Sequence, residues 1–258
     1  MISLSEIRAF YPPHLQVQGA FILREYLQYK ILEILFQSEY ANQFAFIGGT
    51  CLRIVHNNQR FSEDLDFDNF DLTEEDFLLV SQIIKKGLEE QNLETEIKNV
   101  LRGAFHCYIK FPNLLYDSGL SGHQEAKILI NLDTEPQAFE FEPQNHFLNK
   151  FDVFTSIKTT PIDLLLSQKF LAITHRKRPK GRDFFDVVFL LSKTKPNYDF
   201  LAQKLNITTP KQLKKHLIEV CNQFDFKELG RDVAPFLFNA NDIKKVTLFP
   251  EYIQSVSL

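Results

Sequence analysis

The stretch that most constrains this chain runs from Phe44 to Asp68, where a short apolar run meets two glycines. Residues 44–47 are aromatic, small or branched, and they predict a buried strand. Gly48-Gly49 ends that run, and residues 50–55 have the apolar spacing of a helix, with Thr50 as its expected N-cap. Backbone N–H groups at such a strand–turn–helix junction point outward, and phosphate is a ligand that suits them.

A run of alternating carboxylates follows in the same stretch. Asp64, Asp66 and Asp68 are two residues apart, so a strand places them on one face. Leu65 and Phe67 then face the core. Neighbours on one face lie about 7 Å apart along a strand, and two carboxylates at that spacing repel each other unless a cation lies between them. Oxygen ligands favour Mg²⁺, so the turn and the carboxylates together predict metal-assisted phosphoryl or nucleotidyl chemistry.

Each of these features alone also has an ordinary structural interpretation. Two adjacent glycines are common in tight turns between a strand and a helix. Alternating aspartates are common on a solvated face of a strand. The order of the two features and their closeness in the chain favour a nucleotide site.

The residues of this stretch resemble a known motif. Gly48-Gly49-Thr50, followed by Arg60-x-Ser62-x-Asp64-Leu65-Asp66-Phe67, is similar to the first motif of the AbiEii/AbiGii-type nucleotidyltransferases. These are toxins of bacterial abortive-infection toxin–antitoxin systems, within the DNA polymerase β-like nucleotidyltransferase superfamily. The resemblance implies transfer of a nucleoside monophosphate from an NTP, with Mg²⁺ (two ions) as cofactor. It also implies an RNA acceptor, in particular tRNA, and a cognate antitoxin as partner.

The composition limits the class of protein. The chain has 258 residues and a net charge of −4, so any binding site for a polyanion must be a local patch. Cys51, Cys107 and Cys221 are widely separated, and we expect them to be reduced thiols. The sequence shows no signal peptide and no apolar run of about 18 residues, so we expect a cytoplasmic protein that does not enter a membrane.

The remainder of the first half predicts helices and strands in a mixed order. A capping box at Thr73 starts one of the helices. The predicted elements are a helix over residues 14–38, a helix from Thr73 to about Glu90, two strands within 94–111 that turn near Arg102-Gly103, a strand over 126–133, a loop over 136–150 and an edge strand over 151–159.

A third carboxylate completes the metal site in a polymerase-type palm, on a strand beside the first pair. The strand over 126–133 offers Asp133, with Asn131 on the same face. The family usually has this acidic residue inside the strand, whereas Asp133 stands at its end. Either Asp133 fills the role, or the third carboxylate is missing and Asp133 only begins the following turn.

A second motif lies further along the chain. Thr160-Pro161 predicts the start of a helix that carries Lys169 and ends near Thr174. A loop over residues 175–182 holds five lysines and arginines, and a further helix begins at Asp183. The family likewise carries a Lys in the helix before a basic loop, and Lys180-x-Arg182-Asp183-x-x-Asp186 resembles the motif that follows it.

Lys169 and Arg182 have the charge to bind a triphosphate, and Arg forms bidentate contacts with phosphate. Asp183 stands at a helix N-terminus, where a carboxylate is stabilised, and we expect it to orient these cations. The ordinary alternative is a charged loop between helices with a capping Asp. The position of this motif after the first favours the nucleotide-binding role.

The sequence therefore predicts an α+β protein. Residues 1–155 form a mixed-sheet nucleotidyltransferase core with flanking helices, and residues 156–258 form a helical half that completes the active-site cleft. Short helices are expected over Tyr198–Leu205, Pro210–Gln223 and Phe226–Leu237, with a further segment near residues 242–256.

The predicted site falls into three groups of residues. The catalytic residues are Asp64, Asp66, Asp133, Lys169 and Asp183; the nucleotide-binding residues are Gly48, Gly49, Thr50, Ser62, Lys169, Arg182 and Asp186; and the metal ligands are Asp64, Asp66 and Asp133. Two other functions stay open at this point: a non-catalytic module that binds NTP or RNA, and a protein that binds a partner through its helical half.

Overall fold

A computed structural model describes residues 2–176 and 178–258 of the chain. The chain divides into two compact units. The first consists of Met1–Val55 and Phe61–Thr160, and the second of His56–Arg60 and Pro161–Leu258. The short segment His56–Arg60 therefore belongs to the second unit, although both of its neighbours in sequence belong to the first.

The first unit is built on a seven-stranded sheet with the strand order β3-β4-β5-β2-β1-β7-β6. The sheet is mixed, because β1 is antiparallel to β2 and parallel to β7, while β2 is parallel to β5. This confirms the predicted α+β class with a mixed sheet. The strands are β1 (Phe44–Ile47), β2 (Leu65–Asn69), β3 (Glu96–Arg102), β4 (Ala104–Phe111), β5 (Ile128–Thr134), β6 (Gln144–Lys150) and β7 (Val153–Thr159).

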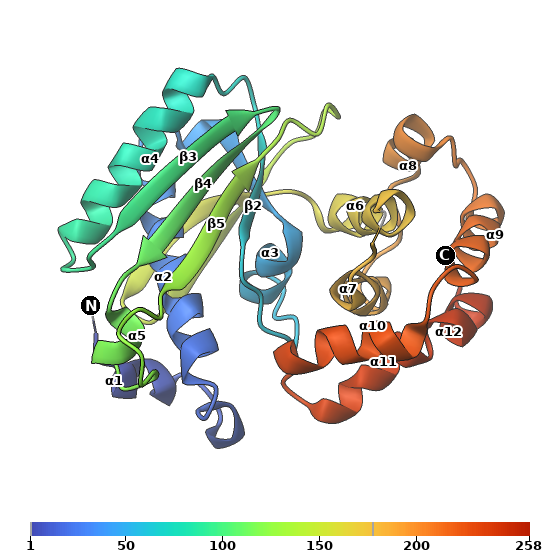
Figure 1. Ribbon diagram of the computed structural model, residues 1–258. Coiled ribbons are helices and arrows are strands. Elements are labelled where there is room, and N and C mark those ends of the chain that lie inside the picture. The colour runs from blue at the N-terminus through green and yellow to red at the C-terminus, as the bar shows by residue number, and fades with distance from the viewer. Residues whose placement is uncertain (1, 177) are drawn as a thin grey trace. The chain divides into compact units, whose positions relative to one another are not determined.

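Helices flank this sheet (Figure 1). The helix α2 packs on β5 and β7, and α4 packs on α2, β3 and β4. The capping box at Thr73 is confirmed, with Asp76 as its second member. The helices of this unit are α1 (Leu4–Ala9), α2 (Gly19–Phe36), α3 (Gly48–Ile54), α4 (Glu74–Glu89) and α5 (Leu114–Asp117), with 3₁₀ turns η1 (Pro13–Leu15) and η2 (Ala41–Gln43).

Phenylalanine fills the space between α2 and the centre of the sheet. Phe44, Phe46 and Phe67 are at most 1% exposed. The Phe67 ring centroid lies 5.6 Å from that of Phe44, 5.3 Å from that of Phe46 and 6.3 Å from that of Phe36 on α2. Phe67 thus faces α2, as its alternation with the aspartates predicted, and Asp66 points to the opposite side of the sheet.

Two predictions about the end of this unit are wrong. Residues 144–150 are a strand, β6, rather than part of a loop, and β7 is an interior strand because β6 lies outside it. The β6 sequence lacks the alternation of apolar and polar residues that predicts a strand. Leu148 is its only buried residue, and polar residues fill most other positions. Its turn to β7 uses Phe151 at a φ of 60°, where no glycine marks the turn in the sequence.

The second unit is helical (Figure 1). Its core includes Phe184, whose ring centroid lies 5.0 Å from that of Phe226 and 4.9 Å from that of Phe249. None of the described helices combines the length and the apolar character needed to cross a membrane. The helices are α6 (Ile162–His175), α7 (Gly181–Leu191), α8 (Tyr198–Leu205), α9 (Pro210–Cys221), α10 (Phe226–Val233), α11 (Lys244–Thr247) and α12 (Phe249–Ser255), with 3₁₀ turns η3 (Ala234–Phe236) and η4 (Ala240–Ile243).

A buried ion cluster joins three elements of the first unit. Glu25 on α2 accepts hydrogen bonds from Arg53 Nε at 2.8 Å, from Arg53 Nη2 at 3.2 Å and from Lys150 Nζ at 2.7 Å. Arg53 lies on α3 and Lys150 on β6, and Glu25 is only 2% exposed. Burial raises the pKa of the Glu25 carboxyl, but Arg53 and Lys150 outweigh burial and hold that pKa below its ordinary value. The cluster therefore fixes α3 to α2.

Truncation of Arg53 should destabilise the first unit. Arg53→Ala leaves Glu25 buried with one partner fewer, and we expect a loss of about 3 kcal/mol in the free energy of unfolding at pH 7. Because the pKa of Glu25 is lowered by folding, this loss should shrink as the pH falls through the folded-state pKa. Urea unfolding between pH 7 and pH 3 measures both effects. The exposed Lys86→Ala is the control, and an equal loss in both variants would contradict the role of the cluster.

Candidate active site

The turn between β1 and α3 is built against Asp66. Gly48 has a φ of +77°, which a residue with a side chain rarely adopts. A Cβ atom at Gly48 would also overlap Oδ2 of Asp66. The cause is the register of β1 and β2, in which Ile47 pairs with Asp66. Only glycine allows the backbone of the turn and this carboxylate to lie so close together.

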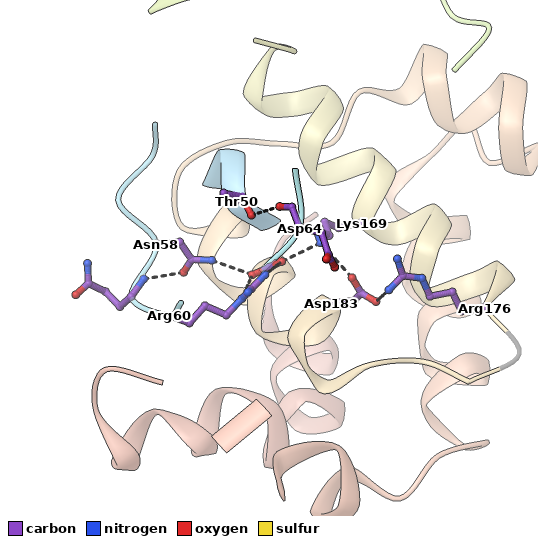
Figure 2. Close-up of polar contacts among 9 residues, drawn as sticks. Thr50, Asn58, Arg60, Asp64, Lys169, Arg176 and Asp183 are labelled. Atoms are coloured by element: carbon purple, nitrogen blue, oxygen red, sulfur yellow. Dashed lines mark hydrogen bonds and ion pairs between the residues drawn. The ribbon is translucent and has the colours of Figure 1, made fainter. Parts of the chain in front are cut away.

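The Thr50 hydroxyl holds the backbone of the carboxylate strand. Ile47 is the N-cap of α3, so the prediction that Thr50 caps this helix is wrong. The Thr50 hydroxyl instead donates a short hydrogen bond to the carbonyl oxygen of Asp64, as Figure 2 shows. Thr50 is fully buried, so this hydrogen bond forms inside the core and fixes the backbone of Asp64.

A second contact holds the residues just before Asp64. The amide Nε2 of Gln28 on α2 donates to the carbonyl oxygen of Ser62 at 3.1 Å and to that of Glu63 at 2.9 Å. Gln28 is only 1% exposed, so these bonds form inside the core. Gln28 thus holds the carbonyl group of the predicted nucleotide-binding residue Ser62 and that of the next residue.

Three of the predicted site carboxylates lie on or directly before two neighbouring strands. Asp64 precedes β2 and Asp66 lies within it, and Asp66 pairs with Asp133 of β5. Residues paired in a ladder point to the same side of the sheet, so the Asp66 and Asp133 side chains share a face. Asp133 lies within β5, one residue before its end, and its Oδ1 is 2.9 Å from Nδ1 of His106. Asp133 is thus a strand residue rather than the start of the turn.

Two buried thiols near these carboxylates have raised pKa values. Burial, with the charge of Asp66 as a second cause, raises the pKa of the Cys51 thiol far above its usual range. Burial, and then Asp133, raise the pKa of Cys107 to about 12. Both cysteines therefore stay protonated at neutral pH and are poor metal ligands, since a coordinating cysteine is a thiolate.

The carboxylates fit a magnesium ion that is shared with a nucleotide. Within residues 2–176 and 178–258, no group of three or more His, Cys, Asp or Glu side chains is arranged to hold a metal ion by itself. Mg²⁺ is usually bound by one or two carboxylates together with the phosphates of its substrate. Asp64 and Asp66, with Asp133 beside them, offer oxygen ligands of this kind next to the Gly48 turn.

The second unit buries a cation between two carboxylates of α7. Lys169 Nζ on α6 lies 3.1 Å from Asp183 Oδ1 and 2.9 Å from Asp186 Oδ2. Asp183 also forms a short ion pair with Arg176, which Figure 2 shows on the side away from Lys169. Burial lowers the pKa of Lys169, but Asp186 and Asp183 outweigh it and hold that pKa above its ordinary value. Lys169 is therefore a fixed positive charge.

Asp186 is the centre of this cluster. It is fully buried, and it accepts from Arg60 Nε at 2.8 Å, Arg60 Nη2 at 2.6 Å and Asn58 Nδ2 at 2.8 Å, besides its ion pair with Lys169. Burial raises the pKa of Asp186, but Arg60 and Lys169 hold it below its ordinary value. Asp186 is fully buried, and the groups that it contacts are Lys169 and residues of the segment His56–Arg60.

Other residues of the second motif have separate places. The Arg182 guanidinium lies over the Phe236 ring, 4.7 Å from its centroid, and the side chain is partly exposed. The loop residue Lys177 lies outside the described part of the chain. The sequence interpretation gave no role to Arg60 or Asn58, although Arg60 is part of the first motif. The position of Arg60 in that motif, four residues before Asp64, could have indicated a role for it.

Comparison with known proteins identifies the family and the fold. Residues 30–245 match the family described as nucleotidyl transferase AbiEii toxin of type IV toxin–antitoxin systems. The fold is similar to that of JHP933 from Helicobacter pylori, with a TM-score of 0.55 and 15% identity over 90% of this chain and 91% of that one. It is also similar to MenT4, a nucleotidyltransferase toxin from Mycobacterium tuberculosis, with a TM-score of 0.54 and 13% identity over 99% and 91%. No curated protein matches the sequence.

Removal of the Thr50 hydroxyl should slow nucleotide transfer with little loss of stability. Thr50→Val keeps the shape of the side chain but frees the Asp64 backbone, and we expect a rate about 10–100-fold lower, as for other residues that orient metal ligands. Thr50→Ser retains the donor and should retain most of the rate. The measurement is the transfer rate as a function of Mg²⁺ concentration, with thermal unfolding in parallel.

The matched control for Thr50 is Thr95. Its hydroxyl is also buried and also donates to a backbone carbonyl, that of Leu93 at 2.8 Å, away from the motif. Thr95→Val should leave the transfer rate unchanged. Equal activity of Thr50→Val and the wild type, or equal losses in the two valine variants, would show that the Thr50 bond has no special role.

Proposed function

We propose that this protein, which belongs to the AbiEii family of nucleotidyl transferase toxins, transfers nucleotides to RNA. The group transferred would be a nucleoside monophosphate from an NTP, and the acceptor would be in particular a tRNA. The family establishes that the protein is a nucleotidyltransferase toxin. The RNA acceptor, the dependence on Mg²⁺ and the assignment of individual residues are the content of the proposal.

One observation carries the proposal. Asp66 lies against the backbone of Gly48, at the turn where the N–H groups of Gly49 and Thr50 begin a helix. The turn that we propose binds the phosphates and the carboxylate that we propose binds their metal ion are therefore neighbours within one unit. This adjacency is what transfer from a metal-bound nucleoside triphosphate needs.

The reaction forms one bond to phosphorus and breaks another. A hydroxyl oxygen of the acceptor attacks the α-phosphorus of the NTP and its proton passes to water, while the bond from the α-phosphorus to the bridging oxygen breaks and pyrophosphate leaves. The backbone N–H groups of Gly48, Gly49 and Thr50 would bind the β- and γ-phosphates. Asp64 and Asp66 would hold the metal ions, and Asp133 would be the third carboxylate. When bound, Mg²⁺ supplies Lewis-acid stabilisation of the charge on the phosphates.

The residues of the second motif would stabilise the negative charge of the leaving group. Lys169 and Arg182 would neutralise the negative charge on the departing pyrophosphate. Asp183 and Asp186 support this role because they hold the Lys169 ammonium in one place and keep it protonated. Ser62, on backbone fixed by Gln28, would contribute a hydroxyl to the nucleotide.

The family also points to a partner and an outcome. A toxin of a toxin–antitoxin system implies a cognate antitoxin, and transfer of a nucleotide to RNA would arrest growth. The cytoplasmic location expected from the sequence fits an RNA acceptor and stays a prediction.

Incubation with total bacterial RNA tests the proposal. Purified protein, Mg²⁺ and each α-³²P-labelled NTP in turn should give label in a discrete RNA band. Asp64→Asn and Asp66→Asn should each lower labelling by about 100-fold or more, because each removes the charge of a proposed metal ligand.

Asp117→Asn is the matched control, since this aspartate is exposed on α5. It should label RNA as the wild type does. Equal labelling by the Asp66→Asn protein would refute the assigned site, and label in protein or in free nucleotide products alone would refute the RNA acceptor.

A further inference from the structure

Two exposed phenylalanines stack on each other on the outer hairpin of the sheet. Phe147 on β6 is 71% exposed and Phe154 on β7 is 66% exposed. Their ring centroids lie 5.8 Å apart, with 19° between the ring planes. Exposure of two large aromatic side chains side by side is costly in water, so a contiguous patch of this kind indicates a binding surface.

The hairpin that carries these rings is fixed by contacts of its turn with α2. Lys150 pairs with Val153, and Phe151 between them packs edge-on against Tyr26 and Tyr29, at centroid distances of 5.4 and 5.2 Å. The Lys150 ammonium is bound by Glu25. The two exposed rings thus stand on a rigid support rather than on a mobile loop.

The rings share a face of the sheet with the carboxylates. Val153, Thr155 and Ile157 of β7 are buried, and β7 packs on α2, so the alternating residue Phe154 points to the opposite face. Phe46 of β1 pairs with both Phe67 and Thr159, which places Asp66 on that same opposite face. One face of one unit therefore carries Asp66 and Asp133 at its centre and the phenylalanine pair at its β6 edge.

The residues around the rings are suited to nucleic acid. Lys158 alternates with the buried residues of β7 as Phe154 does, so it supplies a positive charge on the same face as the two rings. The acidic residue of the hairpin turn, Asp152, is engaged by Lys30 at 3.7 Å and by the Tyr26 hydroxyl at 3.3 Å. The remaining neighbours on the two strands are hydrogen-bonding side chains without charge, namely Asn145, Asn149 and Ser156.

We propose that Phe147 and Phe154 form a stacking platform for unpaired bases of the RNA acceptor. Aromatic side chains on adjacent strands of a sheet stack on bases without regard to sequence, and a lysine beside them binds the phosphodiester backbone. Asn145 and Asn149 have both donors and acceptors for base edges. This inference rests on the proposed function, and it adds a site where the acceptor is held away from the reacting atoms.

The position of the platform sets the length of RNA that it needs. From the pairing registers, Phe147 lies three strands and about four residues from Asp66, which is about 20 Å at a strand spacing of about 4.8 Å and a rise of about 3.3 Å per residue. A stacked strand rises about 3.4 Å per nucleotide, so about six nucleotides span this distance when stacked, and fewer do when the strand is extended. The platform thus holds unpaired bases a few nucleotides away from the reacting end of the acceptor.

Tryptophan fluorescence gives a direct test, because the chain contains no tryptophan. Phe147→Trp and Phe154→Trp each place a single tryptophan in the platform. Titration with an unstructured twelve-nucleotide RNA, without NTP or Mg²⁺, should quench the emission of both in a saturable way. The same RNA in a duplex should quench far less. Tyr116→Trp on α5 is the control, since Tyr116 is also exposed in the first unit, and its emission should not change.

Substitution separates stacking from general apolar contact. Phe147→Leu/Phe154→Leu keeps an apolar surface but removes the aromatic faces, and we expect binding of the twelve-nucleotide RNA to weaken by about tenfold or more. Lys158→Ala should lower the slope of log affinity against log salt concentration by about 0.7, the value for one phosphate contact on a single strand. Thermal unfolding should match the wild type in both variants.

The outcomes distinguish this inference from the proposed function. Unchanged RNA affinity of the leucine variant, or absence of quenching, would overturn the platform and leave an apolar surface for a protein partner, even if nucleotide transfer to RNA is observed. Conversely, quenching by single-stranded RNA supports the platform even if no NTP is transferred, since the titration uses neither nucleotide nor metal ion.

Discussion

The close approach of the Gly48 backbone to the Asp66 carboxylate is the constraint on which the site depends. It requires a strand that ends at Ile47, a second strand in antiparallel register that places Asp66 opposite Ile47, and a residue without a side chain at a positive φ. Each requirement is met by a different part of the motif. A shift of β2 by one residue would turn every carboxylate into the core, so the buried Phe67 also fixes the position of Asp66.

Buried charge holds the functional groups of each unit in place. In the first unit, Glu25 ties α3 to α2, and α3 carries Thr50, whose hydroxyl fixes the Asp64 backbone. In the second unit, Asp186 gathers Arg60, Asn58 and Lys169. Removing one partner of such a cluster leaves a buried charge unpaired, which is far more costly than loss of a surface ion pair. Both clusters thus restrict the motion of elements that carry predicted site residues.

Local patterns in the sequence predicted most of the fold. The strand at Phe44, the capping box at Thr73 and the helix after Pro161 follow from short-range signals, and the structure contains all three. The strand β6 could not be predicted in this way, because an edge strand with a single buried side chain lacks the apolar alternation of an interior strand. The spacing of the residues and the family resemblance also predict a set of site residues, and these assignments stay predictions. The partners of Thr50 and Asp186 could not be predicted, since they depend on pairings 14 and 126 residues apart in the chain.

Binding of a nucleotide without an acceptor tests the central claim most directly, because it isolates the Gly48 turn and Asp66 from every later step. Calorimetric titration with α,β-methylene analogues of the four NTPs, which cannot release pyrophosphate, should show binding that requires Mg²⁺. In Asp66→Asn that requirement should be lost together with most of the affinity. Nucleotide binding that is independent of Mg²⁺ and equal in the two proteins would contradict the account, because Asp66 would then have no part in holding a metal-bound nucleotide.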